Sequence, residues 1–147
     1  MSLKVKDIIK IMDQYAPTKL KEDYDNVGLM IGDKEKQVTK ILVALDTTLD
    51  VIEEAKEKQC NFILNHHPIL FLKPKSITTD TLLGKKIINL IKNDINVYAS
   101  HTNLDSVENG INEMATRILG YDKFKVLDCS RALGYNNGKH GIGRLVS

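Results

Sequence analysis

The stretch Phe62-Ile63-Leu64-Asn65-His66-His67-Pro68 ends an apolar run on two adjacent histidines and a proline. The run predicts a buried strand over residues 62–65, because short continuous apolar runs are typical of parallel sheets. Neighbouring side chains on a strand point to opposite faces, so both imidazoles serve one site only if the chain turns there. Pro68 favours such a turn, since it lacks a backbone N–H donor and restricts the backbone of His67 to extended or turn conformations. Two imidazoles at a strand end, near acidic residues, indicate a metal site.

The segments on either side of this stretch alternate between helical and strand patterns. Apolar runs predict further strands over residues 41–45 and 95–100, and residues 20–33 are interpreted as a loop. Helical spacing predicts helices over residues 4–15, 49–58, from Asp80 or Thr81 onward, and from Asn109-Gly110 to Leu119. The alternation implies βαβ units, and therefore a three-layer α/β/α fold with a largely parallel or mixed sheet. We expect one α/β domain over residues 1–147.

The apolar residues of these segments define the expected core. Strand 41–45 is predicted to be buried, and Thr47 or Thr48 is predicted to cap the helix after it. The two later helices have apolar stripes that we expect to face inward: Leu82, Leu83, Ile87, Ile88 and Ile91 in one, and Ile111, Met114, Ala115 and Ile118 in the other.

Polar clusters follow each of the three predicted strands. They are Asp46-Thr47-Thr48, Asn65-His66-His67 and His101-Thr102-Asn103-Leu104-Asp105. In open α/β sheets, ligands bind beyond the carboxyl ends of the strands. We therefore expect these clusters to meet at one edge of the sheet. Imidazole with carboxylate suits zinc, iron or manganese, and a carboxylate can bridge two ions, as in hydrolytic two-metal sites.

Simpler interpretations exist for several of these residues. Asp105 alone would be read as a helix cap, and only the nearby histidines favour a ligand. For Asp46 the cap is the preferred interpretation, and support of a ligating histidine is the alternative. Tyr24-Asp25-Asn26 reads as a plain turn. Gly141-Ile142-Gly143-Arg144 is a weak glycine pattern that lacks the preceding strand and the spacing of a dinucleotide-binding fingerprint.

Charge and cysteine content narrow the classes of function. The 21 basic and 19 acidic residues give a net charge of +2, which is too balanced to indicate nucleic acid or a membrane as partner. Cys60 and Cys129 are far apart and make no disulfide framework, which fits a reducing compartment. No apolar stretch is long enough for a signal peptide or a membrane span. We expect a cytoplasmic protein.

Four strings together resemble one family. They are Tyr24-Asp25-Asn26-Val27-Gly28-Leu29, Asn65-His66-His67-Pro68-Ile69-Leu70-Phe71, His101-Thr102-Asn103-Leu104-Asp105 and Gly141-Ile142-Gly143-Arg144. In order and spacing they resemble the NIF-three-like family, often labelled GTP cyclohydrolase I type 2 homologs. The family usually has Trp where Tyr24 stands and Thr where Asn65 stands.

The resemblance implies a dinuclear centre of divalent metal ions and a toroidal homohexamer. It implies His66, His67 and Asp105 as metal ligands, with His101 lining the site without being a ligand. The family's remaining ligands lie in a C-terminal His-x-x-x-Glu motif, which this sequence lacks: His140 is followed four residues later by Arg144. The chain therefore resembles the N-terminal portion of a family member, whose sheet the second half would complete.

Two classes of function follow from the resemblance. The first is a metal-dependent hydrolase that acts on a nucleotide or similar heterocycle, with His101 as its catalytic proton carrier. The alternative is a non-catalytic metal-binding scaffold or metal chaperone that binds a protein or nucleic-acid partner. The near-neutral charge does not support the nucleic-acid partner.

Overall fold

The computed structural model describes residues 2–129 and 138–146, which form two compact units. The first unit contains Asn26–Ser100 together with the chain up to Ile11. The second contains Met12–Asp25 and the chain from His101 onward. The expected α/β fold is confirmed by the helices and the mixed sheet of the first unit.

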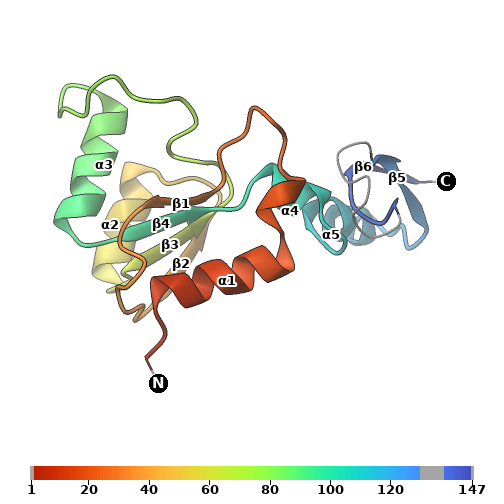
Figure 1. The fold of residues 1–147 in the computed structure, drawn as a ribbon, viewed down its shortest axis with the longest axis horizontal. Helices are drawn as coiled ribbons and strands as arrows, with labels where there is room; N and C mark the ends of the chain where they lie inside the picture. The colour runs from red at the N-terminus through yellow and green to blue at the C-terminus, as the bar shows by residue number, and fades with distance from the viewer. Residues whose placement is uncertain (1, 130–137, 147) are drawn as a thin grey trace. The chain divides into compact units, whose positions relative to one another are not determined.

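The first unit contains a four-stranded sheet (Figure 1). Its strands are β1 (Gly28–Ile31), β2 (Ile41–Ala44), β3 (Phe62–Asn65) and β4 (Asn96–Ala99), in the order β1-β4-β3-β2. Strands β2, β3 and β4 are parallel, and β1 runs antiparallel to β4. Asn65 pairs with Ala44 on one side and with Ala99 on the other, so the three parallel strands end level with one another. Whatever follows them starts at one edge of the sheet.

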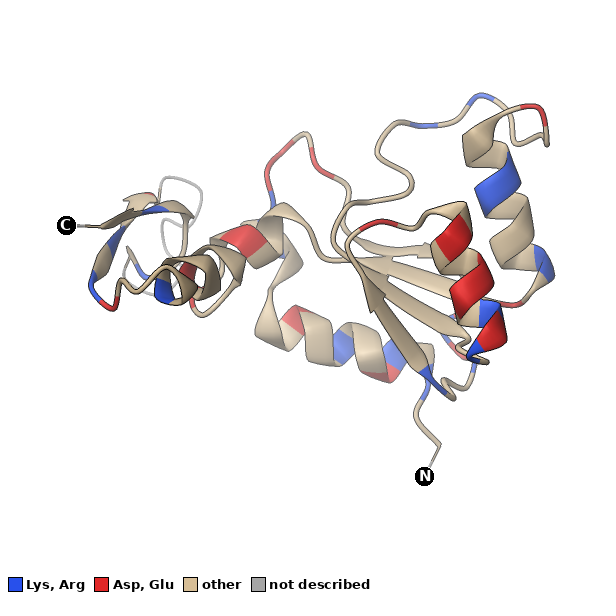
Figure 2. Ribbon diagram, turned by 180° about the vertical axis from the view of Figure 1, so that it is seen from behind, with Lys and Arg blue, Asp and Glu red and all other residues tan. Residues whose placement is uncertain are grey.

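Helices α2 (Leu49–Glu57) and α3 (Leu82–Lys92) cover one face of this sheet, as Figure 1 shows. Each begins at a threonine whose hydroxyl accepts a backbone N–H: Thr48 from Val51, and Thr81 from Gly84. Both caps agree with the prediction from the sequence, because a threonine hydroxyl at a helix start accepts a backbone N–H that would otherwise be unpaired. Acidic residues are concentrated on α2, whereas the charged residues of α3 are lysines (Figure 2).

The core between these helices and the sheet is made of aliphatic side chains. Ile52, Ile63, Leu90 and Val97 are fully buried, and burial of each such side chain contributes about 1.5–3 kcal/mol. Helix α1 (Val5–Tyr15) begins with the buried residues Val5 and Ile8. Within the first unit, its first turns lie along the face opposite α2 and α3 (Figure 1).

Two features of the sheet differ from expectation. Residues 20–33 include β1, a strand too short, and too closely flanked by glycines, to stand out from a loop. Strand β2 is less buried than predicted, because it is an edge strand: Val43 is 72% exposed and Leu45, just after it, 60%. A continuous apolar run does not distinguish an edge strand from a central one.

Gly32 allows the chain to pass close to β4. Its φ is +130°, and an added Cβ would lie 2.0 Å from Oδ1 of the buried Asn96. We expect Gly32→Ala to lower the free energy of unfolding by about 2–3 kcal/mol, measured by urea denaturation. Gly120→Ala is the control, since Gly120 also has positive φ but nothing within 4 Å, and we expect a loss of about 1 kcal/mol. Equal losses in the two variants would contradict the contact with Asn96.

The second unit consists of short helices and a β-ribbon. Its elements are η1 (Thr18–Leu20), α4 (Thr102–Ser106), α5 (Ile111–Ile118), β5 (Phe124–Asp128) and β6 (Ile142–Val146). The ribbon strands are antiparallel. Neither α4 nor the ribbon is predicted by the sequence. Buried Asn103 connects distant parts of this unit, because its Nδ2 donates to the Ala16 carbonyl over 2.7 Å.

Helix α5 buries a different face from the one predicted. Met114 and Ile118 are 53% and 82% exposed, whereas Glu113 and Thr116 are buried. The reason is an ion pair: the Arg144 Nη2 lies 2.9 Å from Glu113 Oε1, and both side chains are almost completely buried. On α3, too, only part of the predicted apolar stripe is buried, because Leu82 and Ile91 are exposed.

Candidate metal centre

The chain turns sharply where β3 ends, as the histidine pair and Pro68 predict. The backbone N–H groups of His66 and His67 both donate to the Leu45 carbonyl, over 3.2 and 3.0 Å. Asn65 supports the turn from inside, since its Nδ2 donates to the His67 carbonyl over 2.7 Å. The two imidazole rings lie 5.0 Å apart between centroids. Adjacent residues therefore present neighbouring rings, which an uninterrupted strand would not allow.

Hydrogen bonds at Nδ1 orient both rings of the pair. His66 Nδ1 lies 2.9 Å from the Ser100 carbonyl oxygen, and His67 Nδ1 lies 2.9 Å from Asp46 Oδ1. Both partners only accept, so Nδ1 donates in each case, and in the neutral tautomer Nε2 carries the lone pair that binds a metal. The preferred interpretation of Asp46 as a helix cap is wrong, because Thr48 is the cap. Its alternative role beside a histidine agrees with this contact.

In the second unit, His101 is held by a buried carboxylate. His101 Nδ1 lies 2.9 Å from Oδ1 of Asp25, whose side chain is fully buried. The other oxygen of Asp25 accepts from the backbone N–H and the hydroxyl of Thr102. Burial acts to raise the pKa of the Asp25 carboxyl, but the hydrogen bonds from His101 and Thr102 outweigh it and hold the pKa below its usual value. Asp25 therefore stays ionised and fixes His101 with Nδ1 protonated.

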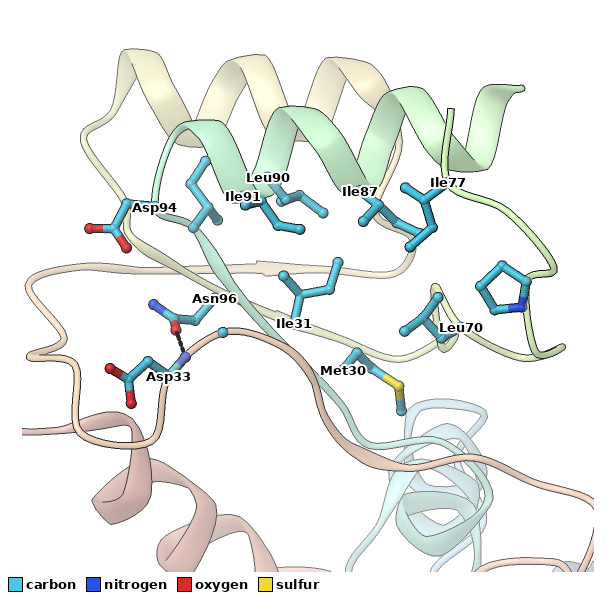
Figure 3. A pocket seen from close by; sticks show the side chains of 13 residues that line it. Met30, Ile31, Asp33, Leu70, Ile77, Ile87, Leu90, Ile91, Asp94 and Asn96 are labelled. Atoms are coloured by element: carbon cyan, nitrogen blue, oxygen red, sulfur yellow. Dashed lines mark hydrogen bonds between the residues drawn. The ribbon is translucent and has the colours of Figure 1, made fainter. Parts of the chain in front are cut away.

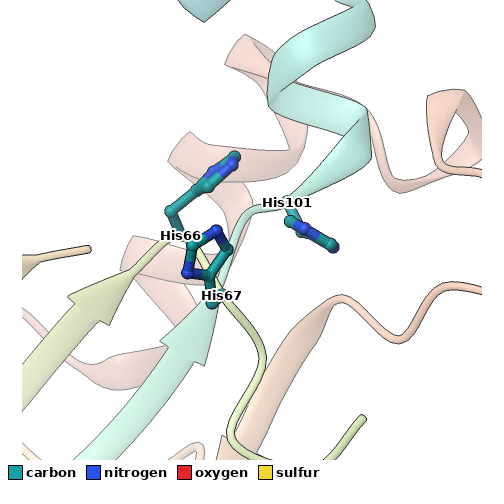
Figure 4. A group of neighbouring side chains, drawn as sticks. All are labelled: His66, His67 and His101. Atoms are coloured by element: carbon teal, nitrogen blue, oxygen red, sulfur yellow. The ribbon is translucent and has the colours of Figure 1, made fainter. Parts of the chain in front are cut away.

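The same three histidines offer a nitrogen donor set (Figure 4). His101 is bonded directly to Ser100, whose carbonyl orients His66, so its backbone starts at the edge where β3 and β4 end. One ring nitrogen of each of His66, His67 and His101 lies within 4.8 Å of the other two. Imidazole nitrogens suit zinc, iron and similar divalent ions, so the residues present fit a metal.

Asp105 lies one helical turn after His101, on α4. Its backbone N–H donates to the His101 carbonyl over 3.1 Å, and its own carbonyl accepts from Asn112. His101 precedes α4 as its N-cap and its backbone angles are not helical, so the four-residue spacing alone does not place the two side chains on one side of the helix. The histidine group that could hold an ion does not include Asp105. Its assignment as a ligand stays a prediction.

The sequence profile described as Duf34/NIF3 (NGG1p interacting factor 3) matches residues 3–147. The chain belongs to the Duf34/NIF3 family. This finding confirms the resemblance drawn from the four strings. Within residues 2–129 and 138–146, no helix combines the length and the apolar character that a membrane crossing requires.

Two curated relatives and one solved structure place the chain within this family. It is 59% identical over 149 residues to a Clostridium acetobutylicum protein and 56% identical over 144 residues to one from Clostridium perfringens, both named GTP cyclohydrolase 1 type 2 homolog. The matches cover 99% and 98% of this chain but 53% of each relative, so the chain spans about half their length. The crystal structure of a Bacillus cereus protein related to NIF3 matches with a TM-score of 0.83 at 38% identity, covering 86% of this chain and 35% of that one.

Proposed function

We propose that this chain supplies metal ligands to a metal-dependent hydrolase that acts on a nucleotide or a similar heterocycle. The observation that supports it most is the shared orientation of three histidines, each with Nδ1 directed to an oxygen acceptor. Such contacts fix the tautomer and the ring direction that metal binding needs. The names of the Clostridium relatives point to the same chemistry.

In this proposal His66, His67 and Asp105 hold divalent ions, two per site in a full-length family member. Ions held there would supply Lewis acidity, which polarises a bond of the target and lowers the pKa of water. His101 takes and returns a proton at Nε2, while Asp25 holds Nδ1 and stabilises the charged ring. Asp46 and the Ser100 carbonyl keep His67 and His66 in their tautomers.

Metal content tests the ligand set. We expect elemental analysis to find zinc or manganese in the unchanged chain. We expect His66→Ala/His67→Ala to lose this metal and Asp105→Ala to lose part of it. His101→Ala should keep it, because a proton carrier is not a ligand. His140→Gln is the control, since His140 belongs to neither histidine string and its Nδ1 accepts the Glu108 N–H. Equal metal in all variants would contradict the proposal, and loss in His101→Ala would make His101 a ligand.

Turnover separates the hydrolase from the non-catalytic metal scaffold. GTP and related nucleotides would be incubated with a full-length family member that contains this chain, with zinc, iron or manganese added. We expect turnover that disappears with the histidine pair. Metal binding without turnover across the panel would favour the scaffold or metal chaperone. We further propose that the full-length protein forms a homohexamer, which light scattering would test through its molar mass. We propose the cytoplasm as its location.

A further inference from the structure

A cleft of about 480 Å³ lies between α3 and β1 of the first unit, bordered also by the chain that follows the histidine pair (Figure 3). Its volume is within the range of small-ligand sites, about 300–1,000 Å³. The walls are aliphatic, with side chains from three separate segments: Met30, Ile31, Leu70, Ile77, Ile87 and Ile91.

The cleft leaves apolar surface in contact with water. Leu90 is fully buried in the core, but its neighbour Ile91 is 61% exposed, and Ile77 on the facing segment is 48% exposed. The apolar stripe of α3 thus extends beyond what covering the sheet requires, and the excess lines the cleft. Concave apolar surface of this kind favours an apolar ligand.

One end of the cleft is acidic. Asp33 and Asp94 lie there beside Asn96 (Figure 3). Asn96 accepts the Asp33 N–H over 3.0 Å and so holds the Asp33 backbone in place. Lys36 pairs with Asp94. In the described part of the chain, the Asp33 carboxylate accepts the Glu35 N–H but pairs with no cation, so this end retains negative charge.

We propose that this cleft binds an amphipathic organic cation, with an aliphatic body against Ile31, Leu70 and Ile91 and an ammonium group beside Asp33. The aliphatic walls match the body of such a ligand, and its charge complements the acidic end. An anionic amphiphile of equal length would meet the Asp33 carboxylate and bind more weakly. This site is independent of the histidine cluster and of the proposed hydrolysis.

Three probes of equal chain length test the site by isothermal titration calorimetry: octylammonium, 1-octanol and octanoate. We expect octylammonium to bind about fivefold more tightly than 1-octanol, as an exposed charge pair allows, and octanoate most weakly. Asp33→Asn should reduce octylammonium binding to the level of 1-octanol and leave 1-octanol unchanged. This variant keeps the shape of the side chain, so a folding defect would not imitate the result.

A second variant tests the apolar wall. Ile91→Gln should weaken all three probes several-fold, whereas Ile118→Gln, at an exposed apolar position of α5, should change none of them. Circular dichroism would confirm that both variants fold. Equal binding of octylammonium and octanoate, binding insensitive to Ile91→Gln, or the absence of binding by all probes would overturn the proposal.

Discussion

Arg144→Met is expected to lower the free energy of unfolding by about 3–5 kcal/mol, the usual result of removing one partner of a buried ion pair. The Arg144 side chain is 1% exposed, and its Nε and Nη2 both donate to Glu113 Oε1. Its Nη1 donates to the carbonyls of Gly141 and Gly143, over 2.7 and 2.8 Å. Methionine fills similar space but leaves a buried carboxylate and three carbonyls, that of Val107 included, without this donor. Urea denaturation followed by circular dichroism would measure the loss.

Arg117 provides the matched control, because it approaches the same carboxylate from solvent. Arg117 Nη2 lies 3.7 Å from Glu113 Oε2, and its side chain is 51% exposed. We expect Arg117→Met to cost less than about 1 kcal/mol. Adding Glu113→Gln to Arg144→Met should recover part of the loss, since it removes the buried charge. If the two arginine variants are equally stable, the buried pair does not have the role given to it.

The elements predicted well are those whose signals are local. Strand β3, helix α2 and helix α3 each combine an apolar pattern with a recognisable start, such as the threonine caps of the two helices. Alternation of these elements is enough to indicate a parallel sheet, and hence the edge at which its strands end together. The turn at His66 and His67 follows from the same local reasoning.

The errors come from interactions between distant residues. Helix α5 looks amphipathic from Met114 and Ile118, but a partner 31 residues away, Arg144, pulls Glu113 into the interior instead. Asp25 looks like a turn residue because its partner His101 lies 76 residues further along the chain. A single sequence contains no fixed spacing that would reveal a buried carboxylate paired with an imidazole. Only the fold brings the two together.

Asp25→Asn is expected to change the tautomer of His101 while keeping the shape of the site. Asp25 Oδ2 accepts two donors from Thr102, one of them a backbone N–H, so the amide oxygen of Asn must take that place. The amide NH₂ then faces His101 Nδ1, which has to become an acceptor, and the proton moves to Nε2. Nitrogen NMR of the imidazole rings would detect this exchange directly. Any turnover that needs proton acceptance at Nε2 should fall about 10²–10⁴-fold.

The predicted change is specific to a buried pair, and Asp46→Asn is its control. The Asp46 and His67 side chains are 51% and 48% exposed, so water can replace the lost acceptor, and we expect His67 to become a mixture of tautomers in Asp46→Asn instead of changing fully to the Nε2–H form. Metal content should be unchanged in Asp25→Asn if His101 carries protons, and should fall if His101 is a ligand, because a ring protonated at Nε2 cannot bind an ion there. A His101 ring that stays protonated at Nδ1 in Asp25→Asn would show that Asp25 does not set its tautomer.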